Sequence, residues 1–204
     1  MQDQWYADKR DLVKWGSLVH LAREYRIQSI LQVAFFRPTK PKHLLSIDGD
    51  CHAALAPEVW DHFRDIRQVK CLGRRTGLEI DVFDQDFRNR DAYIRVLTTQ
   101  IHEYSSASRV VLLDPDTGIA PLKSQPSLKH VLPSEVERIW AVLRTGDVLV
   151  LYQHQRRTRK WIAETRGQFA DAVKTSQAEV RTIKSACREL ASDVAFFAAR
   201  RERG

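Results

Sequence analysis

The sequence lacks any apolar run that approaches the roughly 20 residues a helix needs to span a bilayer. Residues 1–10 are polar and contain no apolar core of the kind that a secretory signal peptide carries. Both absences argue against a membrane-bound or exported protein. We therefore expect a soluble protein that stays in the cytoplasm.

Cysteine is scarce, with only Cys51, Cys71 and Cys187 in the chain. Their number is odd, their spacing is wide, and no Cys-x-x-Cys pair occurs. These features exclude a disulfide framework and a cysteine-based zinc site, so we expect reduced structural thiols. The number and spacing of the cysteines therefore give us no residue to assign as a metal ligand.

Linkers and repeats are also missing, because no segment is rich in proline, glycine and serine and no stretch recurs. The 204 residues are 43% hydrophobic and 29% charged, which is typical of a globular chain rather than a disordered one. A chain of this length supports one well-buried core and is short for two. We predict a single α/β domain over residues 1–204.

Two kinds of apolar pattern alternate along the chain. Helical spacing of apolar residues predicts helices, whereas short runs that are apolar on both faces predict buried strands. We expect helices over residues 8–25, 57–70, 89–105, 133–144 and 158–174, and strands over residues 27–36, 43–48, 78–83, 109–113, 148–152, 180–185 and 194–198. This alternation predicts an α/β fold with a mostly parallel sheet covered by helices on both faces.

Polar segments directly follow two of the fully apolar strands. Asp114-Pro115-Asp116-Thr117-Gly118 follows one of them, and Tyr152-Gln153-His154-Gln155 ends the other. Ligands of parallel sheets bind at the carboxyl ends of strands, so the two segments predict the functional site. Asp114 and the Pro115 carbonyl can accept hydrogen bonds from an amine, and His154 can act as acid, base or ligand. Asp-Thr-Gly is equally good turn chemistry, which is the structural alternative.

The first predicted helix adds charged and aromatic residues to the candidate set. Asp11 and Lys14 are three residues apart and share one face, where a surface ion pair is the alternative to a functional role. Trp5 and Tyr6 precede this helix, and they either cover the edge of the core or stack on a base.

The chain carries a net charge of +7, which favours anionic partners such as nucleic acid without requiring one. Four cations follow the strand at residues 148–152 and form the candidate nucleic-acid-binding cluster, Arg156, Arg157, Arg159 and Lys160. The sequence does not indicate whether RNA or DNA is bound, nor the oligomeric state.

With these residues assembled, the chain resembles S-adenosylmethionine-dependent methyltransferases. Residues 7–15 resemble the Ala-Gly-Asn-x-x-Asp-x-x-Lys-His opening of the bacterial enzymes that methylate an adenine amine in large-subunit ribosomal RNA. Asp114-Pro115 occupies the place of their Asp-Pro-Pro-Tyr, and the last two predicted strands are similar to the antiparallel hairpin that ends their fold. Residues 110–154 more closely resemble uncharacterised bacterial and phage proteins with an Asp-Pro-Asp-Asn-Gly loop.

The resemblance implies a three-layer, Rossmann-like fold with a mostly parallel sheet and a C-terminal antiparallel strand pair. It implies S-adenosylmethionine as cofactor, with Asp114 and the Pro115 carbonyl accepting the hydrogens of the target amine and Lys14 near the methyl-transfer site. With the residues singled out above, our candidates for catalysis are Asp114, Asp116, Lys14 and His154, and our candidates for cofactor binding are Pro115, Tyr6 and Asp48.

The sequence departs from the family's pattern at two places. Asp116 and Thr117 replace the second proline and the aromatic residue of the Asp-Pro-Pro-Tyr motif. The turn after the first predicted strand, residues 33–38, has no glycine that would let the backbone approach a cofactor.

Two other interpretations stay open. In a metal-dependent nuclease or phosphoesterase, Asp114 and Asp116 would hold Mg²⁺ or Mn²⁺ together with Asp48, Asp50 or His154. A non-catalytic nucleic-acid-binding protein would keep the fold without its chemistry, and its affinity would fall steeply with salt.

Overall fold

The structure is a computed structural model that describes residues 9–37, 44–47, 51–54, 66–104, 107–122, 125, 127–187 and 189–202. The candidates Tyr6, Asp48 and Asp50 lie outside these residues, as does most of the predicted helix 57–70. The helices and strands are α1 (Lys9–Glu24), β1 (Ser29–Val33), β2 (Leu44–Ile47), β3 (Cys51–Ala54), the 3₁₀ helix η2 (Ile66–Val69), α3 (Lys70–Thr76), β4 (Glu79–Phe83), α4 (Arg90–Glu103), β5 (Arg109–Leu113), β6 (Gly118–Ile119), β7 (His130–Val131), α5 (Pro133–Val142), β8 (Val148–His154), α6 (Trp161–Ala172), β9 (Arg181–Ile183) and β10 (Val194–Arg200).

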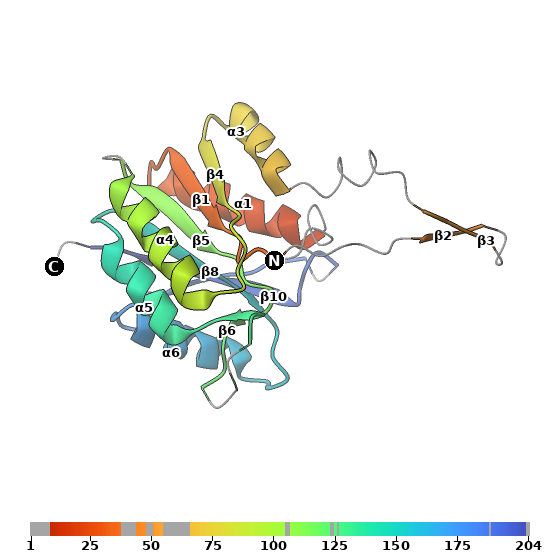
Figure 1. The fold of residues 1–204 in the computed structure, drawn as a ribbon. Helices are drawn as coiled ribbons and strands as arrows, with labels where there is room; N and C mark the ends of the chain where they lie inside the picture. The colour runs from red at the N-terminus through yellow and green to blue at the C-terminus, as the bar shows by residue number, and fades with distance from the viewer. Residues whose placement is uncertain are drawn as a thin grey trace.

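A six-stranded sheet in the order β4-β1-β5-β8-β10-β9 forms the centre of the molecule (Figure 1). The strands β4, β1, β5 and β8 are parallel to one another, whereas β10 runs antiparallel to both β8 and β9. This confirms the predicted Rossmann-like fold, including the C-terminal antiparallel pair.

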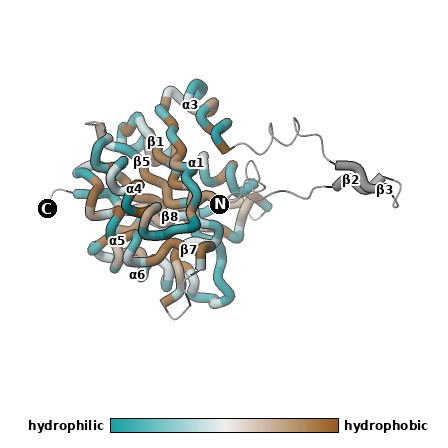
Figure 2. Tube along the Cα trace, in the orientation of Figure 1, coloured by the Kyte–Doolittle hydropathy of each residue, from teal (hydrophilic) through white to brown (hydrophobic). Residues whose placement is uncertain are grey.

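Helices cover both faces of the sheet because the central strands are apolar on both sides. In β5, Val111 and Leu113 pack into the core beneath α4, α5 and α6, whereas Val110 and Leu112 pack into the core beneath α1 and α3. The alternation follows from the two-residue period of a strand. Figure 2 shows the hydrophobic residues gathered along these inner strands.

The strand β8 is longer than the sequence pattern predicts, and this corrects the placement of Gln153 and His154. These residues belong to the strand itself rather than to the loop after it, because β8 pairs with β10 without a break from His154↔Val194 to Val148↔Arg200. They consequently point alternately to the two faces of the sheet.

Three other elements differ from expectation. The expected strand at residues 43–48 appears as β2, but it pairs with the unexpected β3 in a separate two-stranded sheet. The loop after β5 contains the short parallel pair β6 and β7. The end of the predicted helix 57–70 differs as well. Ile66–Val69 form the 3₁₀ helix η2, and the α-helix α3 begins at Lys70, where the predicted helix was expected to end.

The structure also bears on the lack of long apolar runs and on the few cysteines. Within the described residues, no helix is both long enough and apolar enough to cross a membrane. Cys71 and Cys187 are free thiols as expected, but both are exposed, so they are not part of the packed core.

Gln153 holds the loop after β5 against β8. Its side chain is buried, accepts a hydrogen bond from the Ile119 amide at 3.0 Å, and donates to the Thr117 carbonyl at 2.8 Å. Gly118 between them has a φ of +102°, and a Cβ atom added there would lie 2.1 Å from Gln153 Oε1. Only glycine fits this position.

The substitution Gly118→Ala should lower the free energy of unfolding by about 2–4 kcal/mol, because it adds left-handed strain and breaks the contacts of Gln153. Gly77→Ala is the matched control, since Gly77 has a φ of +73° but no atom within 4 Å of an added Cβ. Equilibrium urea unfolding measures both losses. Equal losses in the two variants would contradict the role assigned to Gln153.

Candidate functional site

The candidate site lies where the connections of the sheet change direction. β1 lies between β4 and β5, and the chain leaves β1 toward β4 but leaves β5 toward β8 on the other side. Ligands of open α/β sheets bind at such a switch point, outside the carboxyl ends of the strands. Asp114 directly follows β5 at this point, and its amide donates to the Val33 carbonyl at the end of β1.

Asp114 forms a buried charge cluster with residues from two other elements. Its Oδ2 atom accepts from Lys14 Nζ of α1 at 2.9 Å and from Gln32 Nε2 of β1 at 2.6 Å. Lys14 Nζ also lies 2.5 Å from Asp11 Oδ1. The Lys14 and Asp114 residues are each only 3% exposed, so this is not the surface ion pair that the sequence left open for Lys14.

Burial by itself lowers the pKa of Lys14, but the charges of Asp114 and Asp11 outweigh it, and the net pKa lies above the ordinary value. Lys14 is therefore an ammonium ion at neutral pH and cannot serve as a base. What Lys14 can contribute at this position is positive charge. Lys14 and its two carboxylates together carry a formal charge of −1.

Asp116 is paired with Arg37, which comes from the turn after β1. Both side chains are largely buried, at 15% and 18% exposure. The ion pair supplies a positive partner for Asp116.

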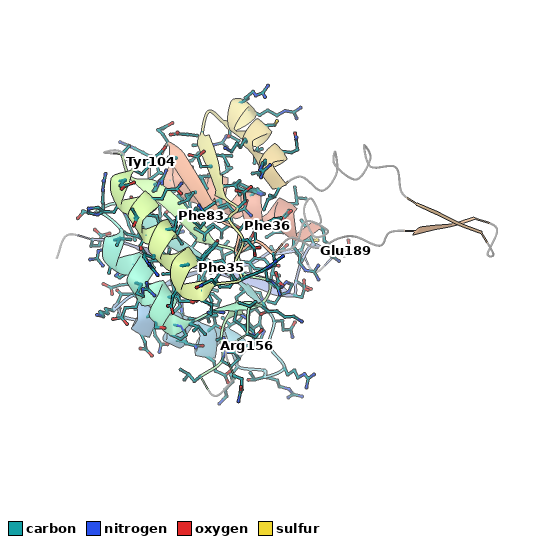
Figure 3. All side chains as sticks on the ribbon, viewed as in Figure 1. Phe35, Phe36, Phe83, Tyr104, Arg156 and Glu189 are labelled. Carbon is teal, nitrogen blue, oxygen red and sulfur yellow. The ribbon has the colours of Figure 1, made fainter. Side chains whose placement is uncertain are left out.

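The turn that presents Arg37 contains Phe35 in the left-handed region, with a φ of +46°. The Phe35 side chain is fully buried against Phe87 and Tyr93, and its amide donates to Tyr93 Oη at 3.0 Å. Figure 3 labels Phe35 and Phe36, which follow β1, and Phe83 of β4 in the same part of the view. A bulky residue in this conformation costs about 1–2 kcal/mol, and such strain concentrates at functional sites.

Tyr152 and His154 extend the site along β8. Their positions two residues apart place both side chains on the α1 face of the sheet. Tyr152 Oη lies 2.8 Å from His154 Nε2, and Lys14 Nζ lies 5.8 Å from the centre of the Tyr152 ring. The structure thus brings Asp114 and Lys14 together and joins His154 to them through Tyr152.

The four cations after β8 divide into two groups. Arg156 is half-buried, and its Nη2 donates to the Ile119 carbonyl at 2.7 Å and to Gln168 Oε1 at 3.2 Å. Burial lowers its pKa. Arg157, Arg159 and Lys160 are exposed at the carboxyl edge of the sheet.

Several site residues were missed from the sequence. Gln32 is a buried amide between the apolar residues Leu31 and Val33 of β1, and that contrast is the signal that could have revealed it. Asp84 follows β4 at the same edge of the sheet as Asp114, with its carboxylate 26% exposed and bonded to Arg67 Nε at 2.7 Å. Asp193 lies beside His154 only through the pairing of β10 with β8, which no local pattern indicates.

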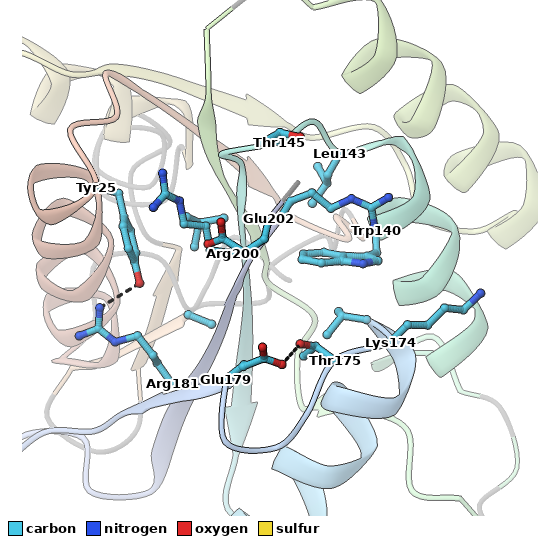
Figure 4. Close-up of a pocket in the computed structure, with 14 residues that line it drawn as sticks. Tyr25, Trp140, Leu143, Thr145, Lys174, Thr175, Glu179, Arg181, Arg200 and Glu202 are labelled. Carbon is cyan, nitrogen blue, oxygen red and sulfur yellow. Dashed lines mark hydrogen bonds between the residues drawn. The ribbon is translucent and has the colours of Figure 1, made fainter. Parts of the chain in front are cut away.

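A pocket of about 710 Å³ lies at the opposite edge of the sheet, where β8 begins and β10 ends (Figure 4). Its cations are balanced by carboxylates, because Arg181 pairs with Glu24, Lys174 pairs with Glu137, and Glu179 and Glu202 also line it. None of the candidate residues lies there.

Among the described residues, no group of three side chains of the His, Cys, Asp or Glu type is placed to hold a metal ion.

Replacing Lys14 by methionine should cost about 3–5 kcal/mol at neutral pH, because it leaves buried carboxylates without their ammonium partner. In the native protein, the raised pKa of Lys14 means that its contribution is complete below about 10.4 and is lost only in more alkaline solution. Chemical unfolding between acid and alkaline pH measures these differences.

The double variant Lys14→Met/Asp114→Asn is the control for that prediction. It should lose less than the sum of the two single variants, since the two side chains interact directly. Strict additivity would contradict the pairing.

No family model matches the sequence, and no curated protein matches it. Among solved structures, the chain is similar to a proposed methyltransferase from Thermobifida fusca, with 12% identity, 96% of this chain and 81% of that chain covered, and a TM-score of 0.45. It is similar to a DUF574 family protein from Streptomyces avermitilis, with 12% identity, 95% and 82% covered, and a TM-score of 0.43. It is also similar to an S-adenosylmethionine-dependent methyltransferase from Clostridium acetobutylicum, with 8% identity, 93% and 92% covered, and a TM-score of 0.39. Because all three TM-scores are below 0.5, the fold assignment depends on the strand order and pairing of this chain alone.

Proposed function

We propose that this protein is an S-adenosylmethionine-dependent methyltransferase that modifies an amine of a nucleic acid at the Asp114 site. The observation that carries the proposal is the buried cluster of Lys14, Asp114 and Gln32 at the switch point of the sheet. Burying an ion pair seldom adds stability over apolar residues of the same size. A charged cluster at the edge where α/β folds bind ligands therefore favours a chemical role.

The charge of the cluster suits a cationic reaction. Lys14 with Asp11 and Asp114 carries a formal charge of −1 in a region from which water is largely excluded. A low-dielectric site strengthens the attraction between such a charge and a positive group. A sulfonium ligand and an amine that gains positive charge both match it, whereas a bare phosphate does not.

Two features of the site are consistent with a cofactor that carries an adenosine. Asp84 follows the strand next to β1, a position from which nucleotide-binding folds of this type hold ribose hydroxyls. Phe35 supplies the left-handed turn after β1 that glycine supplies in most such folds. The missing glycine thus does not prevent the turn, although it carries a cost in strain.

S-adenosylmethionine, when bound, supplies an electrophilic methyl group. The residues of this chain bind and orient the acceptor. Lys14 and Gln32 hold the Asp114 carboxylate through Oδ2, so that the carboxylate and the Pro115 carbonyl can accept hydrogen bonds from the target amine. These acceptors align the amine and stabilise the positive charge that develops on its nitrogen.

The proposed nucleic-acid partner is supported by the net charge of +7 and by the exposed cations Arg157, Arg159 and Lys160 beside the site. Arg156 is engaged within the fold and is not part of this surface. The metal-dependent alternative has no such support, because Asp114 and Asp116 are each paired with a cation from this chain.

The native protein should bind S-adenosylmethionine and S-adenosylhomocysteine in the range of about 1 μM to 1 mM that is typical of enzyme substrates. Asp84→Asn should weaken both by about 10-fold or more, because it removes a charged acceptor for the ribose. Asp86→Asn is the matched control, since Asp86 pairs with Arg88 in the same loop. Calorimetry measures the affinities, and a native protein that binds neither compound at millimolar concentration would sink the proposal.

Replacing Arg157, Arg159 and Lys160 by glutamine should reduce the salt dependence of binding to single-stranded RNA. The slope of log affinity against log salt should fall by about 2, the value for three lost phosphate contacts on a single strand. The triple variant Arg74→Gln/Arg75→Gln/Arg95→Gln changes the net charge equally on exposed helix residues elsewhere. Identical slopes for both variants, measured by fluorescence anisotropy, would place the RNA somewhere else.

A further inference from the structure

Tyr152, His154 and Asp193 form a chain of titratable groups beside Asp114. Tyr152 Oη and His154 Nε2 are 2.8 Å apart, and His154 Nδ1 lies 3.8 Å from Asp193 Oδ2. Asp193 is in turn fixed by Arg10 of α1, whose Nη2 donates to the same oxygen at 2.7 Å. His154 is therefore within hydrogen-bond distance of Tyr152 and within ion-pair distance of Asp193, an arrangement suited to moving a proton.

The register of the sheet places the start of this chain at the candidate site. Leu113 of β5 pairs with Leu151 of β8, so Asp114 and Tyr152 are the next residues on neighbouring parallel strands. Both lie on the α1 face, because Lys14 contacts the Asp114 carboxylate and stands over the Tyr152 ring. A ligand held at Asp114 is therefore next to Tyr152.

The proposed reaction needs a proton acceptor, and the cluster at Asp114 does not provide one. An amine that gains a methyl group becomes an ammonium ion and must lose a proton. Lys14 is already protonated, since its pKa is raised by the two carboxylates despite its burial. The Asp114 carboxylate is held by Lys14 and Gln32.

We propose that Tyr152, His154 and Asp193 are a proton relay that removes the proton released by an amine bound at Asp114. The N–H bond of the methylated ammonium breaks, its electron pair stays on nitrogen, and the proton goes to Tyr152 Oη. The proton of that phenol passes to His154 Nε2, and the imidazolium faces Asp193. Tyr152 is the catalytic residue here, and His154 and Asp193 act through it. The relay depends on the proposed methyl transfer for its substrate.

The charged and titratable groups around the relay have opposite effects on His154. From its own strand, the Tyr152 phenol lies 2.8 Å from Nε2; in the tautomer that leaves Nε2 unprotonated, the phenol donates to it and stabilises the neutral imidazole. From the residue before β10, the Asp193 carboxylate faces Nδ1 and stabilises the imidazolium. From α1, Arg10 donates a hydrogen bond to the Asp193 carboxylate, and the Lys14 ammonium lies over the Tyr152 ring.

These opposite effects provide a test that needs no cofactor. The pH at which the His154 imidazole is half-titrated, followed by NMR in the full chain, should fall by about 1 pH unit in Asp193→Asn. It should rise in Tyr152→Phe, and the midpoint of the exposed His102 should stay constant in both variants. Absence of either shift, or a shift of opposite sign, overturns the relay whatever the outcome for methyl transfer.

The second arm measures transfer of labelled methyl to RNA. Tyr152→Phe should lower kcat by about 10²–10⁴-fold with KM nearly unchanged, which is the usual contribution of a proton-transfer group. His154→Gln, which still accepts from the phenol but cannot take its proton, should lose a similar factor. Tyr104→Phe, at the other end of the sheet, is the control and should retain full activity. If Tyr152→Phe keeps its kcat the relay is wrong, whereas a native protein without any transfer counts against the proposed function instead.

Discussion

The contact between the Lys14 ammonium and the Asp114 carboxylate is the interaction on which the rest of the site depends. Both groups are withdrawn from water, so neither is tolerated without the other. The contact joins α1 to the end of β5 across 100 residues of sequence. It thereby ties α1, which packs on this face through apolar residues, to the carboxyl edge of the sheet and holds the Asp114 carboxylate.

The other parts of the site are arranged around this pair. Gln32 enters from β1 to share the same carboxylate oxygen, and Tyr152 enters from β8 beneath the Lys14 ammonium. Gly118 and Gln153 hold the loop after Asp114 close to β8. The result is a rigid carboxyl edge in which polar groups from α1, β1, β5 and β8 converge, as preorganised sites require.

Much of this fold could be predicted from the sequence because its strands are apolar on both faces. A run such as Val110-Val111-Leu112-Leu113 can only be a buried strand, and the residues after such strands must meet at one edge. The length of β8 could not be predicted, since its last three residues are polar or amphipathic and are held in the strand by pairing with β10. Likewise, Asp193 reaches His154 through tertiary pairing alone.

The two departures from the methyltransferase pattern have different physical explanations. Asp116 in place of proline is balanced by Arg37, so it does not require a metal ion. The missing glycine after β1 is replaced by Phe35, whose left-handed conformation is held by packing against Phe87 and by the bond from its amide to Tyr93. Neither compensation is visible in the sequence, because both depend on residues that are distant along the chain.

The most direct measurement is a crystal structure of the protein with S-adenosylhomocysteine. We expect the ligand to lie at the carboxyl ends of β1 and β4, with its ribose at Asp84 and its sulfur toward the Lys14–Asp114 pair. A ligand bound in the pocket at the opposite edge of the sheet, or no bound ligand at millimolar concentration, would contradict it.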